Sequence, residues 1–259
     1  MNNTFNIQRF GLLLKRQWLE FGKIYLISLL VALGVIIAFY AVALWGNFFN
    51  ERPFFDNVLN FREPLFLIFG FIFISIIASN YFAHMGQKPK AIIDLLIPAS
   101  TFEKFLTGIF FTSVLTYISF ILLFYITDLL FITKLKGIYS NDYTELQFLF
   151  SKNRKDFFMP LYVVPFFVTS VFLLGSIYFN KFHYIKTAIS VMIFSGIIFL
   201  ILFKTGEFLF DGKILIQQED RNMNHMPQHT AEWLGVLLLV VLTAIFWSIT
   251  YVRLKEKEV

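Results

Sequence analysis

Six apolar segments, each about 20 residues long, leave this chain few possible folds. They cover residues 24–45, 64–84, 106–133, 157–178, 184–203 and 233–252. A segment of this length crosses a bilayer as an α-helix, because a helix satisfies its backbone hydrogen bonds internally. Strands of a membrane barrel would be about half as long and would alternate in polarity, and these segments do neither. The sequence therefore predicts an all-α integral membrane protein, with six transmembrane helices in one transmembrane domain covering residues 1–259.

The composition agrees with lipid as the main solvent. Hydrophobic residues make up 58% of the 259 and aromatic residues 20%, whereas a soluble domain is about 45–50% apolar. Cysteine is absent, which excludes disulfides, thiolate zinc sites and cysteine nucleophiles. The net charge of +5 is compatible with nucleic-acid binding, but in a membrane protein it more often reflects basic cytoplasmic loops. We therefore expect no nucleic-acid partner.

Residues 1–23 are predicted to form an amphipathic helix lying in the membrane interface. Apolar residues recur there at helical spacing: Ile7, Phe10, Leu14 and Trp18. Trp18 and the basic residues Arg9, Lys15 and Arg16 suit the headgroup region of the lipid bilayer. The segment lacks the apolar core and the small-residue cleavage site of a signal peptide. A solvated helical lead-in to the first span is the alternative.

The charge distribution predicts the orientation of the spans. An even number of spans places both termini on one side, together with residues 85–105 and the short turn after residue 178. That side carries twelve basic and five acidic residues, whereas the other side carries ten basic and eleven acidic ones. The excess of basic residues in short loops predicts that both termini and the 85–105 loop are cytoplasmic.

The 85–105 loop, MGQKPKAIIDLLIPASTFEKF, has the most specific local pattern. An amphipathic run over residues 91–97 predicts a short helix, which Pro98 ends. Ser100 and Glu103 then have the spacing of a capping box, in which each side chain accepts a hydrogen bond from a backbone N–H at the helix start. The loop is therefore either an ordinary connector with a well-capped following helix, or a helix presented to a partner.

The longer connections on the outer side contain two further predicted elements. Residues 143–150 are compatible with a short helix. In residues 204–232, the Asp211–Gly212 pair lies between apolar runs and favours a type I′ turn, so we expect a small β-hairpin. An extended lid over the outer ends of the spans is the alternative.

Motifs for catalysis, nucleotide binding or metal binding are not found. The sequence has no GxxxxGK[ST], HExxH or GxSxG motif. His225 and His229 are four residues apart, but two ligands alone make no closed metal site. Asp128 falls near the outer end of the third segment. We favour its interpretation as a carboxylate at the membrane interface over its interpretation as a residue of a transport pathway. We therefore predict no catalytic residue, no cofactor and no metal.

Three features resemble the membrane subunit of an ABC exporter of the ABC-2 permease type. FNIQRFGLLLKRQWLEFGK, running into the first span, is similar to that family's elbow helix. Six spans with both ends cytoplasmic match its layout. KPKAIIDLLIPASTFEKFL resembles its coupling helix, and the LIPAS-x-FEKFL run is similar to permease-like chains of Bacteroidetes-type bacteria. The polar, hairpin-like connection before the last span departs from the family, which often has re-entrant helical pieces there.

The resemblance implies an ATP-driven exporter in a bacterial cytoplasmic (inner) membrane. A separate ATP-binding cassette ATPase subunit would hydrolyse ATP, so this chain would not be an enzyme, and a second permease copy or a paralogue would complete the pathway. The residues implied in docking the ATPase are Lys90, Ile92, Asp94, Leu95, Leu96 and Pro98. An apolar ridge with charged flanks suits a groove on a soluble partner.

Two other functional classes remain open. A non-transporting membrane scaffold or assembly protein would have the same hydropathy and no ATPase partner. A lipid-modifying enzyme would need polar residues gathered at one depth, and only a thin set lies near the cytoplasmic surface: Asn80, His84, Asn180 and His183.

Overall fold

A computed structural model describes residues 5–49, 59–83, 96–139, 148–150, 162–209 and 228–257. Within these ranges the ordered elements are all helical, as the sequence predicts. In chain order they are α1 (Ile7–Phe49), α2 (Arg62–Tyr81), α4 (Thr101–Ile109), the π-helix η3 (Phe110–Leu115), α5 (Thr116–Ile138), α7 (Val164–Tyr178), α8 (His183–Leu209) and α9 (Gln228–Lys257). The all-α prediction is confirmed for the described part of the chain.

Five helices are long and apolar enough to cross a membrane: α1, α2, the continuous α4–η3–α5 helix, α8 and α9. The fourth predicted span, residues 157–178, corresponds in the described residues to α7 alone, which has 15 residues. At about 1.5 Å per residue it is roughly 22 Å long, shorter than a hydrocarbon core of about 30 Å. The prediction of six full spans is therefore not confirmed.

Pro165 explains where α7 begins. It occupies the first turn of the helix, where proline is tolerated because its missing N–H would have no partner within the helix. Nine of the 15 residues of α7 are buried, and the helix packs mainly against α2 and α9. α7 is thus largely enclosed by protein.

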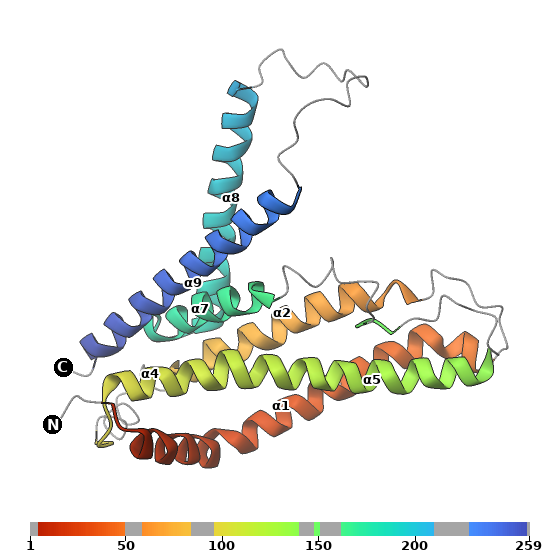
Figure 1. Ribbon diagram of the computed structural model, residues 1–259, viewed down its shortest axis with the longest axis horizontal. Coiled ribbons are helices and arrows are strands. Elements are labelled where there is room, and N and C mark those ends of the chain that lie inside the picture. Colours follow the sequence, from red (N-terminus) through yellow and green to blue (C-terminus); the bar gives the residue numbers. More distant parts are fainter. Residues whose placement is uncertain are drawn as a thin grey trace.

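The long helices fall into two groups: three that pack side by side, and two that point away from them. Figure 1 shows α1, α2 and the α4–α5 helix lying side by side, while α8 and α9 rise away from them. The beginning of α1 and the end of α9 lie at the same end of the molecule (Figure 1). We call it the terminal end, and the far end of α1 and α5 the distal end.

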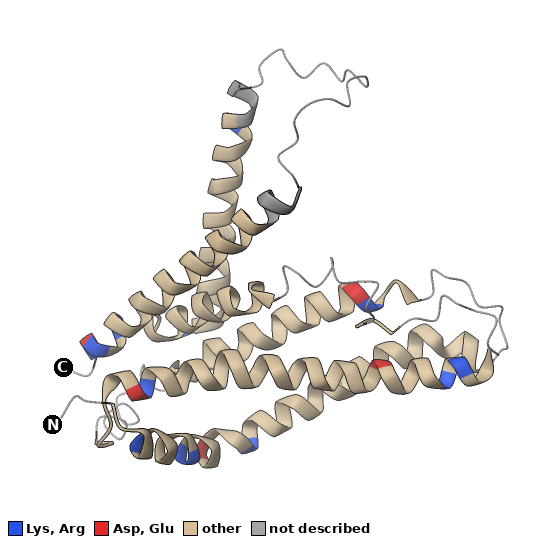
Figure 2. Ribbon diagram, viewed as in Figure 1, with Lys and Arg blue, Asp and Glu red and all other residues tan. Residues whose placement is uncertain are grey.

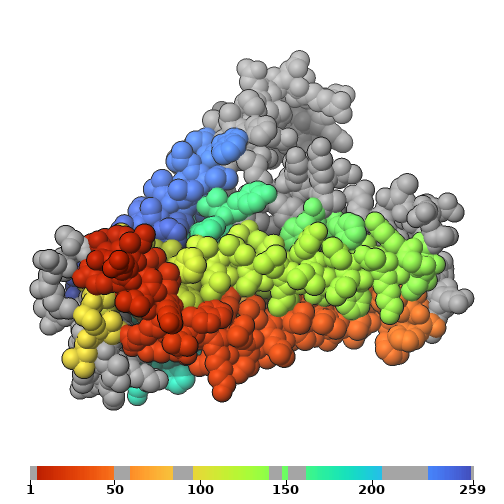
Figure 3. All heavy atoms as spheres, turned by 60° about the horizontal axis from the view of Figure 1, so that its bottom comes forward, coloured from red at the N-terminus to blue at the C-terminus, as the bar shows by residue number. Residues whose placement is uncertain are grey.

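Two helices extend well beyond the predicted spans. α1 joins the predicted interfacial segment to the first span without interruption and is bent, so that its N-terminal part points in a different direction from the rest (Figures 1 and 3). The third long helix runs from Thr101 to Ile138. Hydropathy locates the apolar part of such a helix, but the helix itself extends into the flanking polar residues until a helix-breaking residue is reached.

Aromatic side chains fill the core between α1, α2 and α5. Phe66, Phe120 and Phe124 pack with ring centroids 5.0–6.3 Å apart, and the ring of Tyr40 lies 6.0 Å from that of Phe124. Gly70 permits this packing, since a Cβ there would lie 2.8 Å from the ring of Phe120.

Much apolar surface faces outward. In the most apolar windows of α8 and α9, only 6% and 11% of the residues are buried within the protein. Figure 2 shows long uncharged stretches between helix ends that carry charge. This distribution is typical of helices whose sides contact lipid or another apolar partner.

Candidate functional site

The predicted docking loop is described only in part. Lys90, Ile92, Asp94 and Leu95 lie outside the described residues. Residues 96–100 are not helical, so the predicted 91–97 helix does not include Leu96 or residue 97. In this stretch the N–H of Ala99 donates to the carbonyl of Ile97 at 2.8 Å, as in a tight turn.

The two described docking residues are accessible. Leu96 is 76% exposed, although it is apolar, and Pro98 is also exposed. The short stretch between Leu96 and Ser100 leads directly into the third long helix. Its surface is available to a partner at the terminal end of the molecule.

The capping box at the start of α4 is confirmed. The N–H of Glu103 donates to Ser100 Oγ at 3.2 Å, and the N–H of Ser100 donates to Glu103 Oε2 at 2.9 Å. Two otherwise unpaired backbone donors are therefore satisfied at the point where the helix begins.

Glu103 also connects α4 to the beginning of α1, a contact that the sequence does not reveal. Its Oε1 accepts from the N–H of Asn6 at 2.8 Å and from Arg9 at 2.9 Å. The carboxylate is fully buried, whereas the Arg9 side chain is 33% exposed. The ring of Phe5 packs edge-on against Phe102, 6.2 Å away. We call this set the N-terminal junction; it holds the starts of the first and third long helices together.

The C-terminal helix joins the same end of the molecule. The ring of Tyr251 in α9 lies 6.1 Å from Phe102 and 5.5 Å from Phe105. Lys257 Nζ donates to the carbonyl of Ile177, the penultimate residue of α7, at 2.5 Å. The terminal end is therefore a contact point of four helices.

The predicted membrane-interface residues have different surroundings. Arg9 forms an ion pair with Glu103 at 2.9 Å, and its side chain is 33% exposed. Lys15 is exposed, and Arg16 forms an ion pair with Glu20 at 2.8 Å. Trp18 is 43% exposed. The location of all four residues in a membrane interface stays a prediction, and Arg9 also belongs to the N-terminal junction.

A buried charge cluster lies towards the distal end. Arg62 and Asp128 form an ion pair at 3.0 Å with side chains only 2% and 1% exposed. Tyr40 donates to Asp128 Oδ1 at 2.9 Å, and the N–H of Leu149 donates to Oδ2 at 2.9 Å. Arg62 Nε donates to the carbonyl of Leu59 at 3.2 Å. The cluster thus joins α1, α2, α5 and the 148–150 segment.

The interpretation of Asp128 as an interfacial carboxylate stays a prediction about its depth in a membrane, but the side chain is not solvated. The residue is buried and paired, because the start of α2 brings an arginine to it. The signal that could have found the pair is the rule that a carboxylate within a span has a charged or hydrogen-bonding partner. Arg62 is a basic residue at the edge of the second predicted span, but several other basic residues lie near span edges.

The third long helix changes its winding where it meets α7. Over Phe110–Leu115 it is a π-helix. This form is rare in proteins overall, and where it occurs it is often found at functional sites. Thr116 Oγ1 donates to the carbonyl of Phe111, five residues back, at 2.8 Å. Ser113 lies 2.8 Å from Thr169 of α7, hydroxyl to hydroxyl. Buried hydroxyls therefore link α7 to the one irregular stretch of the long helix.

The remaining predicted features lie in the outer connections. The Asp211–Gly212 hairpin, His225 and residues 143–147 of the predicted 143–150 helix lie outside the described residues, and residues 148–150 are not helical. His229 lies within α9. No group of three or more metal-ligating side chains occurs among the described residues. Of the thin polar set near the terminal end, the Asn80 side chain donates to the carbonyl of Ile76 in its own helix.

Comparison of the chain with known protein families, curated proteins and solved structures gives no match.

Proposed function

We propose that this chain is the membrane-spanning permease subunit of an ATP-driven ABC exporter, with ATP bound and hydrolysed by a separate subunit. The observation that supports the proposal best is the N-terminal junction. It lies directly after the loop that resembles a coupling helix, and it joins the two long helices that a moving partner would have to displace.

The transmission step follows from the contacts of Glu103. Force applied at Leu96 reaches Ser100 through the three residues between them and enters the third long helix at its cap. Because Glu103 also holds Asn6 and Arg9, the start of α1 moves with it. A buried, multiply bonded carboxylate resists separation, since each lost donor would leave an unpaired polar group. The two helices would therefore respond as one body.

In this proposal, the exposed surface of α8 and α9 is where a second subunit binds. These helices bury little of their apolar area within this chain. In the proposal, a second copy or a paralogue covers part of it and lipid covers the remainder. The substrate pathway then runs between the two permease subunits in a bacterial inner membrane, with both termini cytoplasmic.

The experiment that tests the proposal is purification of the tagged chain from its native membrane in mild detergent. We expect a nucleotide-binding subunit to co-purify in a fixed ratio, with ATP hydrolysis in the eluate. Leu96→Asp should abolish the association and leave membrane insertion intact, because it places a charge on an exposed apolar contact. Ile138→Asp, at the opposite end of the same long helix and also exposed, is the matched control and should leave the association unchanged.

Two outcomes would contradict the proposal. Association that survives Leu96→Asp would show that the loop does not dock the partner. A pure chain without any ATP-binding protein would favour a non-transporting scaffold, in which the loop is an ordinary connector and both substitutions are tolerated.

A further inference from the structure

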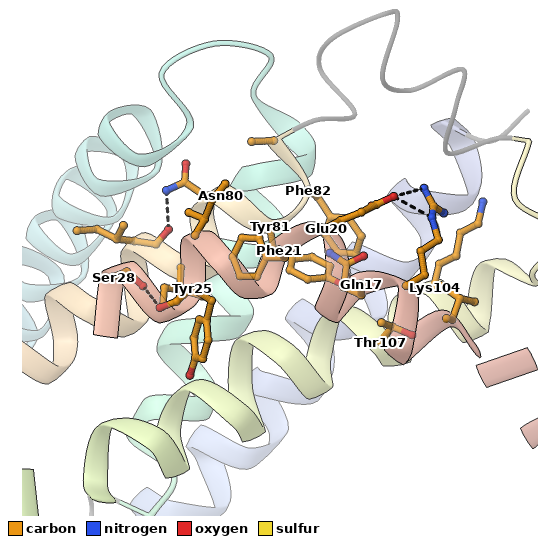
Figure 4. A pocket seen from close by; sticks show the side chains of 16 residues that line it. Gln17, Glu20, Phe21, Tyr25, Ser28, Asn80, Tyr81, Phe82, Lys104 and Thr107 are labelled. Atoms are coloured by element: carbon orange, nitrogen blue, oxygen red, sulfur yellow. Dashed lines mark hydrogen bonds and ion pairs between the residues drawn. The ribbon is translucent and has the colours of Figure 1, made fainter. Parts of the chain in front are cut away.

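A half-open groove lies between α1 and the end of α2 (Figure 4). Its volume is about 650 Å³, within the range of small-molecule sites. One wall is a single face of α1 over four turns, and the other is the last part of α2 together with α4. No step of the proposed coupling uses this groove.

The groove changes in polarity along its length. Figure 4 shows Gln17, Glu20 and Lys104 towards one end, and Tyr25 and Ser28 towards the other. Arg16 lines the polar end as the ion-pair partner of Glu20.

The other end of the groove is mostly apolar. Ile24, Ile76 and Ile77 line it. Its polar side chains are bonded within their own helices, since Asn80 donates to the carbonyl of Ile76 and Ser28 Oγ to the carbonyl of Tyr25. Aromatic rings lie between the two ends, with Phe21 6.1 Å from Tyr81.

The direction of this change matches a bilayer. Along α1 the polar end belongs to the predicted interfacial segment, residues 1–23, and the apolar end to the predicted span, residues 24–45. α2 runs in the opposite direction, so its residues 83 to 76 also lead from the interface towards the membrane interior. A ligand lying in the groove would have its polar part at the headgroup level and its apolar part among the hydrocarbon chains.

We infer that the groove binds one glycerophospholipid with a zwitterionic phosphoethanolamine headgroup. The polar end offers charges of both signs: the Arg16 guanidinium is suited to the phosphate and the Glu20 carboxylate to the ammonium. One acyl chain lies along the apolar end past Ser28. The open side of the groove leaves the second chain in the bilayer.

The existing Arg16–Glu20 pair does not oppose this binding. Their side chains are 34% and 55% exposed, and an exposed pair of this kind is weak. The lipid phosphate can therefore replace Glu20 as the partner of Arg16, and the lipid ammonium can replace Arg16 as the partner of Glu20. Neither side-chain charge is then left unpaired. The inference requires only that the chain lies in a membrane as predicted, and it does not rest on the transport function.

Native mass spectrometry of the delipidated full chain tests the inference with three lipids that share the same acyl chains. We expect one bound dioleoyl phosphatidylethanolamine per chain, weaker binding of dioleoyl phosphatidylglycerol, which lacks the amine, and the weakest binding of dioleoylglycerol, which lacks the phosphate. Arg16→Gln and Glu20→Gln should each lower phosphatidylethanolamine binding by about tenfold or more. Ser28→Phe should block it by filling the apolar end.

Matched controls come from the same chain. Arg253→Gln breaks another exposed ion pair, with Glu256, and Ser190→Phe enlarges another serine that bonds within its own helix. Both should bind the lipid like the wild-type chain. Equal binding of dioleoylglycerol or phosphatidylglycerol, or undiminished binding by Arg16→Gln and Glu20→Gln, would overturn the inference. The Arg16→Gln and Glu20→Gln variants keep the test valid if Ser28→Phe does not fold.

Discussion

At Asp128, a carboxylate within an apolar helix is held by an arginine, a tyrosine and a backbone N–H. Each partner comes from a different part of the chain. A charge in such surroundings is tolerated only when its hydrogen-bonding capacity is met, because an unpaired charge in a low-dielectric interior is expensive. The cluster therefore fixes the relative positions of α1, α2 and α5 near the distal end.

Arg62→Met should destabilise the protein strongly. The substitution keeps most of the side-chain volume but leaves Asp128 without its counter-charge, and breaking one half of a buried pair costs about 3–5 kcal/mol. The free energy of unfolding in mixed micelles measures the loss. Arg253→Met, which breaks an exposed pair, should cost about 1 kcal/mol or less.

A second substitution separates charge from packing. Asp128→Asn in the Arg62→Met background removes the remaining charge and keeps an oxygen that can accept a hydrogen bond. The double variant should regain a good part of the lost stability. If it is as unstable as Arg62→Met alone, packing of the arginine side chain is the important contribution.

The residue scale also shows where sequence-based prediction ends. The Ser100–Glu103 capping box involves residues three apart and follows from local spacing. The Arg9–Glu103 and Arg62–Asp128 pairs join residues separated by 94 and 66 positions. Such pairs depend on which helix faces pack together. The sequence has several basic residues near span edges, and their positions do not indicate which one pairs with which carboxylate.

At the scale of elements, the contact between α7 and α8 depends on one glycine. A Cβ at Gly175 would lie 1.9 Å from Thr187 Oγ1, far inside any permitted contact. Small residues at such crossings let membrane helices approach closely. The short α7 is held between its neighbours through this contact and the Ser113–Thr169 contact with the long helix.

Gly175→Ala should force α8 away from α7 and lower the midpoint of thermal unfolding. Overpacking of this kind costs about 1–3 kcal/mol. Gly196→Ala is the matched control in α8, since a Cβ there meets nothing within 4 Å, and it should leave stability unchanged or slightly raised. Equal midpoints for the two variants would show that α7 and α8 are not in close contact.

The existence of most elements followed from hydropathy, but their lengths did not. Five of the predicted spans correspond to long apolar helices, because about 20 apolar residues in a row specify a helix in lipid. For the span predicted at 157–178, the described helix begins at Val164, although apolar character continues on both sides of that point. Apolar residues fill a protein interior as readily as they face lipid.

At the scale of the whole molecule, the charge distribution and the fold make a joint prediction. The terminal end gathers the start of α1, the start of α4 and the end of α9 (Figure 1). The excess of basic residues in the short loops predicted on that side predicts that this end is cytoplasmic.

Labelling of single cysteines tests this orientation, and the chain suits the method because it has no cysteine of its own. In intact cells, a membrane-impermeant maleimide should label Ile138→Cys at the distal end. It should label Leu96→Cys only after the membrane is permeabilised. Both side chains are exposed within the chain, and the reverse pattern of labelling would invert the proposed topology.

The arrangement of α8 and α9 relative to the other helices did not follow from the sequence. Hydropathy is similar for all five long helices, between 1.9 and 2.7 on the mean scale. It therefore does not distinguish α2, half buried over its apolar window, from α8, which is almost wholly exposed. The difference arises from side-chain contacts such as those of Phe66 and Phe120 with their neighbours.

The Arg62–Asp128 pair has a consequence for the order of events during synthesis. The ribosome adds 66 residues between the two partners, which takes about 3–13 s at the usual rate of translation. Throughout this interval the arginine has entered the membrane region without its carboxylate. Its long side chain can keep the charge at the headgroups until α5 arrives. The second helix should therefore remain loosely placed in the nascent chain, and the emergence of the third should fix it.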